Sequence, residues 1–192
     1  DCIRQEIKLI TMKTVLKIII AILLFIPLFC ASILVFDDGN LKYAEKIEIN
    51  QPVDLVNLLF EDIYNMKKYM PGTQEVLLIS GKNKEPGAKY KIIVTAGTES
   101  MEMIGTLKKN NLPDSLTMTY EMPGVVNIMT QKHQKISDTK TLIVNQQEFQ
   151  FSGLMKIVAF FQPSGFNLDA FKKQSNIYLN SFKNFVENTD KD

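Results

Sequence analysis

The sequence predicts an α+β protein in which a curved antiparallel sheet of about seven strands wraps around one long C-terminal helix, with a transmembrane helix in front. Three observations predict it. Residues 18–36 form an uncharged apolar run. Residues 43–151 alternate between apolar and polar side chains and are divided by turn residues at hairpin spacing. Residues 167–186 place apolar side chains at steps of three and four, the period of an amphipathic helix.

The apolar run is the strongest signal. Its nineteen uncharged residues, 18–36, are close to the roughly 20 that a helix needs to cross the hydrocarbon core. Four basic residues precede the run, and Asp37 and Asp38 follow it. By the positive-inside bias the N-terminus lies in the cytoplasm and the C-terminal domain outside. We therefore expect residues 12–36 to be a single-pass anchor in the cell membrane, with a periplasmic domain if the cell is Gram-negative.

A cleaved signal peptide is the competing interpretation. Residues 12–17 have the form of a basic n-region, and small residues lie at 30–32, near a cleavage position. Against it, the apolar run continues through residues 33–36. Lipid attachment to Cys30 is disfavoured because bulky Phe29 precedes it. In each case the domain is exported. We interpret residues 1–11 as an over-extended start or a short cytoplasmic tail.

Strand and turn signals set the order of the elements after a linker at 37–43. A first strand is expected at 43–50, followed by a helix from Pro52 and a short helical turn at 66–70. Six further strands are expected at 74–80, 89–96, 100–109, 115–122, 125–136 and 140–151. Because the connections are short and rich in Gly, Pro and Asn, sequential strands should pair as an antiparallel meander.

The chain closes with a short apolar segment at 154–161 and the long helix. Pro163 and Gly165 interrupt the chain between them, and we expect a hinge there. Asn167 is the expected cap of the long helix. These boundaries predict a folded domain at 44–188 and a tail at 189–192.

Five segments carry a resemblance to a known family. They are KIEINQPVDLVNLLFEDIYNMKKYMPG at 46–72, EPGAKYKI at 85–92, NLPDSL at 111–116, TLIVNQQEFQFSG at 141–153 and FKNFVEN at 182–188. The chain resembles the START-like, or SRPBCC, superfamily, and most of all its membrane-anchored bacterial members often labelled polyketide cyclase/dehydrase-like. The resemblance implies the helix-grip fold. It departs from the family before Pro71, where Tyr69 and Met70 stand and members often carry Trp.

Composition excludes several kinds of partner. The formal charge of +1 offers no field that would gather nucleic acid. Cys2 and Cys30 lie outside the domain, and a single histidine cannot build a three-histidine zinc site. Glu61 and Asp62 are neighbours on a helix and point about 100° apart, so they are not a two-carboxylate site. We expect no nucleic acid, metal or cofactor, and a monomer.

The cavity between sheet and helix is where we expect a ligand. Strand alternation and the helix stripe give its expected lining as Met101, Met103, Met118, Tyr120, Met122, Phe149, Phe151, Phe171, Tyr178 and Phe182. Flexible thioethers suit chain-like or irregular apolar ligands. The other interpretation is that these methionines only fill the core.

Tyr120, Tyr178, His133 and Glu148 are the candidates for chemistry in this cavity. The two tyrosines either meet a ligand or bind backbone and water. His133 lies within the polar sequence 131–135, which predicts a solvated face. Glu148 alternates with Phe149, which predicts a surface position. No catalytic residue is assigned.

Three functions follow from this pattern. The first is a membrane-tethered domain, bound to the membrane through residues 18–36, that holds a hydrophobic small molecule or lipid. The second is a cyclase or dehydratase, which requires a general acid or base inside the cavity. The third is an envelope interaction protein without catalysis, for which we expect a filled core without a cavity of roughly 300 Å³ or more. We favour the first function because it requires the fewest features in the sequence.

Overall fold

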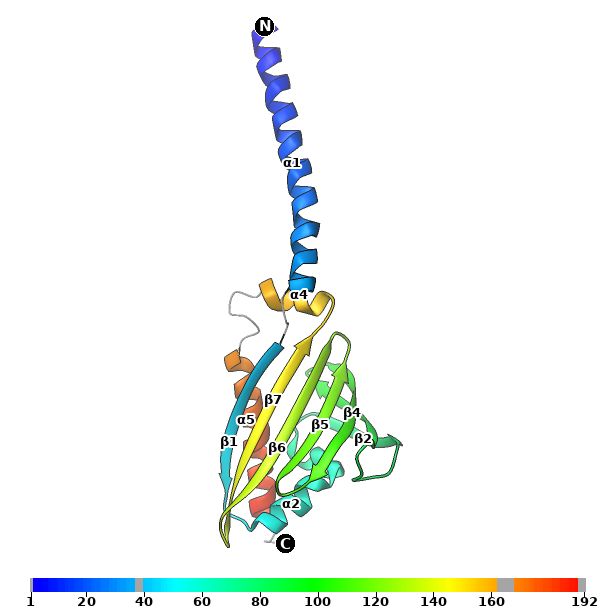
Figure 1. The fold of residues 1–192 in the computed structure, drawn as a ribbon, viewed down its shortest axis with the longest axis vertical. Coiled ribbons are helices and arrows are strands. Elements are labelled where there is room, and N and C mark those ends of the chain that lie inside the picture. The colour runs from blue at the N-terminus through cyan, green and yellow to red at the C-terminus, as the bar shows by residue number, and fades with distance from the viewer. Residues whose placement is uncertain (1, 37–39, 162–167, 190–192) are drawn as a thin grey trace.

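The computed structural model describes residues 2–36, 40–161 and 168–189. A long N-terminal helix, α1 (Cys2–Phe36), projects from one end of an α+β domain (Figure 1). Within α1 the segment Thr14–Ser32 is long and apolar enough to cross a membrane, and none of it is buried inside the rest of the structure. The predicted N-terminal apolar helix is therefore present.

The strands of the domain form one antiparallel sheet. They are β1 (Asn40–Ile49), β2 (Thr73–Ser80), β3 (Lys89–Ala96), β4 (Glu99–Asn111), β5 (Ser115–Met122), β6 (Val125–Ser137) and β7 (Lys140–Phe151). Their order is β1-β7-β6-β5-β4-β3-β2, so β2 to β7 are the predicted meander and β1 adds to its last strand. The predicted fold class is confirmed.

The first strand begins earlier than expected. Residues 40–43, which we assigned to the linker, pair with residues 147–150 of β7. The reason is that Leu41 and Tyr43 are half-buried while Asn40 and Lys42 are exposed, so the alternation of a half-buried strand already starts there. The first strand therefore begins three residues before its predicted start at residue 43.

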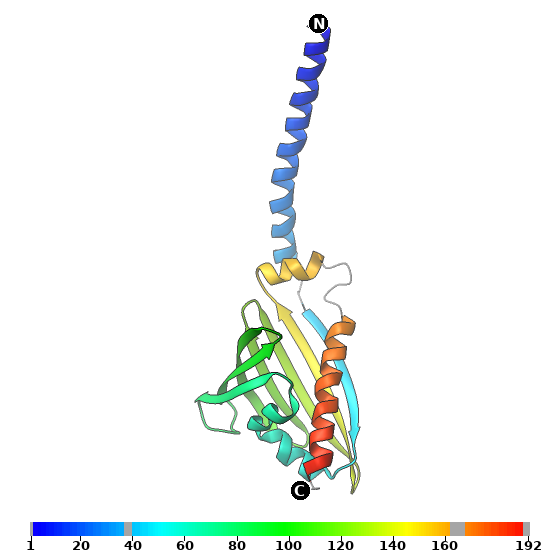
Figure 2. The same cartoon turned by 180° about the vertical axis from the view of Figure 1, so that it is seen from behind.

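The long helix α5 (Leu168–Thr189) crosses the concave face of the sheet (Figure 2). Its apolar stripe is buried at Leu179, Phe182 and Val186. The Phe182 ring lies 4.8 Å from that of Tyr69 and 5.4 Å from that of Phe60, both in edge-on contact. Such pairs add to the free energy of burying the rings. The predicted amphipathic helix is confirmed.

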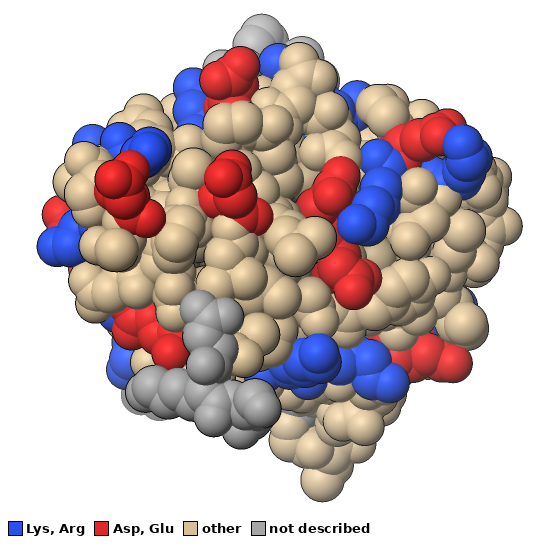
Figure 3. Space-filling view, turned by 90° about the horizontal axis from the view of Figure 1, so that it is seen from below, with Lys and Arg blue, Asp and Glu red and all other residues tan. Residues whose placement is uncertain are grey.

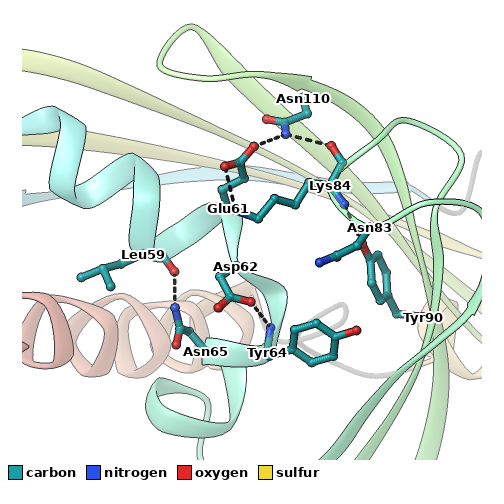
Figure 4. A network of polar contacts seen from close by, with 9 residues as sticks. All are labelled: Leu59, Glu61, Asp62, Tyr64, Asn65, Asn83, Lys84, Tyr90 and Asn110. Atoms are coloured by element: carbon teal, nitrogen blue, oxygen red, sulfur yellow. Dashed lines mark hydrogen bonds and ion pairs between the residues drawn. The ribbon is translucent and has the colours of Figure 1, made fainter.

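Short helices close the end of the sheet away from α1. They are α2 (Val53–Glu61), the 3₁₀ helix η1 (Ile63–Asn65) and α3 (Met66–Tyr69). The Asp62 carboxylate accepts a hydrogen bond from the Tyr64 backbone N–H, and Asn65 Nδ2 donates to the Leu59 carbonyl (Figure 4). These bonds satisfy backbone groups that the change from α2 to η1 leaves without helical partners.

The same end carries a polar cluster outside the cavity. The Glu61 carboxylate accepts from Asn110 Nδ2 at 2.7 Å and pairs with Lys84 Nζ at 3.2 Å (Figure 4). Tyr90 donates its hydroxyl to Asn83 Oδ1 in the loop that holds Lys84. Glu61 and Asp62 therefore have different partners, as their spacing predicted. The Glu61–Lys84 pair fastens the β2–β3 loop to α2.

Helix α4 (Leu154–Phe161) lies between the end of α1 and the sheet (Figures 1 and 2). Lys156 Nζ donates to the Leu34 carbonyl at 3.1 Å, which joins α4 to the last turn of α1. On its other side α4 contacts the β5–β6 turn, where Gly124 has a φ of +76° and leaves room for the Met155 side chain. The expected hinge at Pro163 and Gly165 and the Asn167 cap lie outside the described residues.

Charged side chains of both signs are intermixed on the end of the domain away from α1 (Figure 3). Pairs such as Lys140 with Glu48, at 3.0 Å, link neighbouring strands. A mixed surface has a weak far field.

Candidate ligand-binding cavity

A cavity of about 340 Å³ lies between the concave face of the sheet and α5. Its lining is Tyr43, Phe60, Met66, Tyr69, Met70, Val94, Met101, Met103, Tyr120, Met122, Asn127, Met129, Gln131, Asn145, Gln147, Phe149, Phe171, Gln174, Ser175, Tyr178, Leu179 and Phe182. Most of these side chains are apolar, and methionine and aromatic residues dominate.

The side chains that line the cavity become more exposed from one end to the other. At the end near α2 and α3, Met66, Met129 and Phe182 are buried. At the other end Met101 is 44% exposed and Met122 is half-buried. In the sheet register Met122 pairs with Val125 and Val125 with Phe151, the residue that ends β7 shortly before α4. The mouth of the cavity therefore lies at the end that carries α4 and α1.

Aromatic side chains fix α5 to the sheet near this mouth. The Tyr43 hydroxyl bonds Ser175 Oγ at 2.8 Å and donates to the Phe171 carbonyl at 3.2 Å. The Phe149 ring stacks on Tyr43 at 6.2 Å and meets Phe171 edge-on at 4.7 Å. Burial raises the pKa of Tyr43, so the hydroxyl stays protonated. The wall formed by α5 is thus tied to β1 and β7.

One polar stripe crosses the inner face of β6 and β7. Asn127 Nδ2 donates to Gln147 Oε1 at 2.9 Å, and Gln147 Nε2 donates to Asn145 Oδ1 at 2.6 Å. Asn145 Nδ2 then donates to Gln131 Oε1 at 3.0 Å. The four amides form a continuous chain along the cavity wall, in which each bond runs in the same direction.

His133 ends this chain at the deep end. Gln131 Nε2 is an amide nitrogen, which can only donate a hydrogen bond, and it lies 2.9 Å from His133 Nε2. This ring nitrogen therefore accepts. The protonated Nδ1 donates to Asn57 Oδ1 at 2.6 Å. The ring is 4% exposed, and Phe60 meets it edge-on at 5.3 Å. Burial lowers the pKa of His133 to about 4, so the ring is neutral at pH 7.

The predicted solvated position of His133 is wrong. The polar residues around it suggested an exposed strand face, but β6 alternates, and Met129, Gln131 and His133 all point inward and are buried. His133 stands behind Gln131 rather than on the cavity wall. It positions Gln131 and the amide chain.

The structure brings most of the expected lining together. Met101, Met103, Tyr120, Met122, Phe149, Phe171, Tyr178 and Phe182 line the cavity. Met118 instead lines a smaller cavity of about 30 Å³ beside α2, together with Phe60 and Glu61 of that helix. Phe151 is buried at the end that carries α4 and α1, 6.4 Å from the rings of Phe149 and Phe171, but does not line the cavity.

The described lining of the cavity is uncharged. Tyr69 and Tyr120 have raised pKa values because they are buried, so their hydroxyls remain uncharged. No Asp, Glu, Lys, Arg or His lines the cavity within the described part of the chain. Glu148 lies on the outer face, as predicted, where Gln150 and Lys42 bind it and lower its pKa. Residues 2–36, 40–161 and 168–189 hold no cluster of acidic, His and Cys side chains that would bind a metal.

Sequence reasoning missed Asn127, Gln131 and Tyr43 as lining residues. Asn127 and Gln131 share a face with buried Met129, and that spacing of two was a usable signal. Asn145 and Gln147 share a face with Phe149 through the same spacing of two. Tyr43 was missed because it was placed at the edge of the linker.

No protein-family model and no curated protein matches the sequence. Solved structures do match. The Zhui aromatase/cyclase from Streptomyces sp. R1128 has a TM-score of 0.64 at 14% identity, over 78% of this chain and 94% of that one. Ara h 8.0201 has a TM-score of 0.59 at 14% identity, over 77% of this chain and 98% of that one.

A norcoclaurine synthase from Thalictrum flavum, solved with dopamine and hydroxybenzaldehyde, has a TM-score of 0.57 at 12% identity, over 78% of this chain and 88% of that one. At such identities the likeness concerns the fold. The sheet that wraps α5 and these matches agree with the architecture that the sequence resemblance implied. The chain therefore has the helix-grip fold found in the SRPBCC, or START-like, superfamily.

Proposed function

We propose that this protein is a membrane-tethered, extracytoplasmic domain that holds a hydrophobic small molecule or lipid between its sheet and α5. The observation that carries the proposal is the cavity of about 340 Å³ with an apolar, Met-rich wall. Pockets of this size and lining suit apolar ligands. Burying a ligand there gains free energy in proportion to the apolar area removed from water. The Met side chains adapt their shape to it.

The tether is α1. Its segment Thr14–Ser32 has the length and composition of a membrane span. The basic residues before the span and the acidic residues after it favour a cytoplasmic N-terminus, with residues 12–36 as the anchor and 44–188 as the domain outside. This is the arrangement of the membrane-anchored members that the sequence resembles.

Helix α4 supports a position of the domain against the bilayer. Leu154 is 78% exposed and Val158 43% exposed, and they lie one turn apart on the same face of the helix. Lys156 reaches the end of α1, where the chain would leave the hydrocarbon core. An apolar helix at this height, with a Lys that can extend to the headgroups, is typical of an interfacial helix. The mouth of the cavity then faces the membrane.

The alternatives fit the cavity less well. A cyclase or dehydratase needs a group that exchanges protons near neutral pH. The described lining offers amides and tyrosines, and burial raises the pKa of Tyr69 and Tyr120 further from neutrality. An interaction protein with a filled core does not need the open volume between sheet and helix. Binding is therefore the function we favour.

Native mass spectrometry of the full chain released from detergent micelles tests this proposal. We expect a species heavier than the chain by one apolar molecule, which survives detergent exchange because the cavity shields it. Tandem dissociation would identify that molecule. A spectrum with the bare chain alone, together with no uptake of added neutral lipids, would contradict the proposal.

A further inference from the structure

The amide chain on the cavity wall leaves one acceptor unused. Gln147, Asn145 and Gln131 each accept at their carboxamide oxygen, and His133 accepts at Nε2. Asn127 begins the chain and only donates. Asn127 lines the cavity and is only 8% exposed. Its Oδ1 is buried and has no hydrogen-bond partner among the described residues.

Buried oxygens without a partner are rare in folded proteins, because they lose hydrogen bonds to water and gain none. The direction of the chain prevents a repair from within. If the Asn127 amide turned over, its oxygen would face Gln147 Oε1, and two acceptors would meet. The missing donor must therefore come from the cavity.

The rest of the lining limits what else the ligand contains. A charged group would lose its hydration without a counter-charge, since no charged side chain lines the described cavity. Beyond Asn127 the wall carries the other three amides, whose oxygens are already bonded, and apolar and aromatic residues such as Met129, Leu179 and Phe182. Asn127 lies close to the β5–β6 turn and hence on the mouth side of these residues.

We propose that the ligand is an uncharged amphiphile whose hydroxyl or N–H group donates a hydrogen bond to Asn127 Oδ1 while its apolar part fills the deeper cavity. A long-chain alcohol has this chemistry and a size that the cavity of about 340 Å³ can hold, whereas a fatty-acid anion or a plain hydrocarbon lacks the chemistry. This inference rests on the proposed binding function and names the class of ligand for the same site.

Four probes of matched length separate these classes: 1-decanol, nonyl methyl ether, undecane and decanoate. The ether has the size of the alcohol and lacks only the donor. The full chain, labelled with ¹³C at its methionine methyl groups, is placed in lipid nanodiscs and titrated with each probe at known mole fraction in the bilayer. The methyl signals of Met101, Met103, Met122 and Met129 report entry into the cavity.

For the native chain we expect 1-decanol to bind about tenfold more tightly than the ether or undecane, the usual effect of one buried hydrogen bond. Decanoate should bind more weakly than 1-decanol. Asn127→Leu should bring the alcohol and the ether to equal affinity. Thr119→Val is the matched control, because Thr119 Oγ1 is also buried without a partner in the described chain but does not line this cavity.

The possible results separate this inference from the proposed function. Equal affinity for all four probes, or tighter binding of decanoate, would overturn the inference and leave the binding function standing. No shift with any probe would count against both. The titrations of the native chain need no variant, so they test the ligand class even if Asn127→Leu fails to fold.

The tautomer of His133 provides an independent readout. The chain direction requires the proton on Nδ1, which ring ¹⁵N shifts report directly. A proton on Nε2 would reverse each bond and leave an N–H at Asn127. The ether would then bind as well as the alcohol, and the inference would be wrong.

Discussion

His133 is the residue whose environment departs most from its sequence neighbourhood. Its ring is held between Gln131 and Asn57, and burial lowers its pKa to about 4. A histidine in the unfolded chain has a pKa of about 6.5. Above pH 6.5 both states are neutral at this site. As the pH falls from about 6.5 to 4, the unfolded state binds a proton that the folded state does not, so folding stability falls.

We predict that His133 removes about 3 kcal/mol of folding stability between pH 7 and pH 4. Urea unfolding of the full chain in detergent micelles, followed by circular dichroism, measures this. His133→Gln is the control, since an amide can also accept from Gln131 and donate to Asn57. The difference between the two chains cancels the carboxylates that titrate in the same range. Parallel pH profiles for the two chains would show that His133 is not buried and neutral.

Gly72 and Gly97 belong to turns that the sequence marked as breaks between elements. Both have positive φ, +87° and +64°. A Cβ on Gly72 would also clash with the Thr95 backbone oxygen, whereas a Cβ on Gly97 meets nothing within 4 Å. The two positions share the same backbone strain and differ in steric contact.

We therefore predict that Gly97→Ala costs about 1 kcal/mol of stability and Gly72→Ala about 3 kcal/mol. The Gly72 carbonyl accepts from the Thr95 N–H at 2.8 Å, so the clash also strains the junction between α3 and β3. Urea unfolding of both variants gives the comparison. If the two variants lose equal stability, the close approach at Gly72 is not present in solution.

From the exposed apolar face of α4 we predict that this helix inserts into the membrane interface. The chain contains no Trp, so Leu154→Trp carries a single indole at an apolar position of α4 that is 78% exposed. In nanodiscs its emission should shift to the blue and be quenched by brominated lipid, because insertion of such a side chain gains about 1.5–3 kcal/mol. Leu58→Trp is the control at a 60% exposed position on α2, at the far end of the domain (Figure 1). Equal quenching of both, or of neither, would contradict the interfacial position of α4.

Elements were predictable because their signals are local. The bounds expected for the strands at 89–96, 115–122 and 140–151 agree with β3, β5 and β7, since turn residues mark both ends. The 3.6-residue period of α5 was equally clear. The start of β1 was not, because Leu41 and Tyr43 gain their partners only from β7, more than a hundred residues later.

The residues that line the cavity could be predicted only from the arrangement of the whole molecule. Alternation predicts which side chains share a face, but the inward face follows from the register between strands and from the curvature of the sheet. Met118 and Phe151 satisfy the alternation and still lie outside the main cavity, because Met118 lies at a smaller cavity beside α2 and Phe151 is the last residue of β7. The amide chain spans two strands, β6 and β7, so no single strand pattern could predict it.

In the proposed function a ligand occupies the space between the sheet and α5. Leu179 lines that space and is 5% exposed, so Leu179→Trp fills part of it from the α5 side. Leu58→Trp makes the same change on the surface and leaves the cavity intact. Native mass spectra of the two full-length variants, each with a circular dichroism spectrum like that of the native chain, compare their bound fractions directly. We predict that the bound molecule is lost from Leu179→Trp and retained by Leu58→Trp; equal retention by both would show that the ligand does not lie in this cavity.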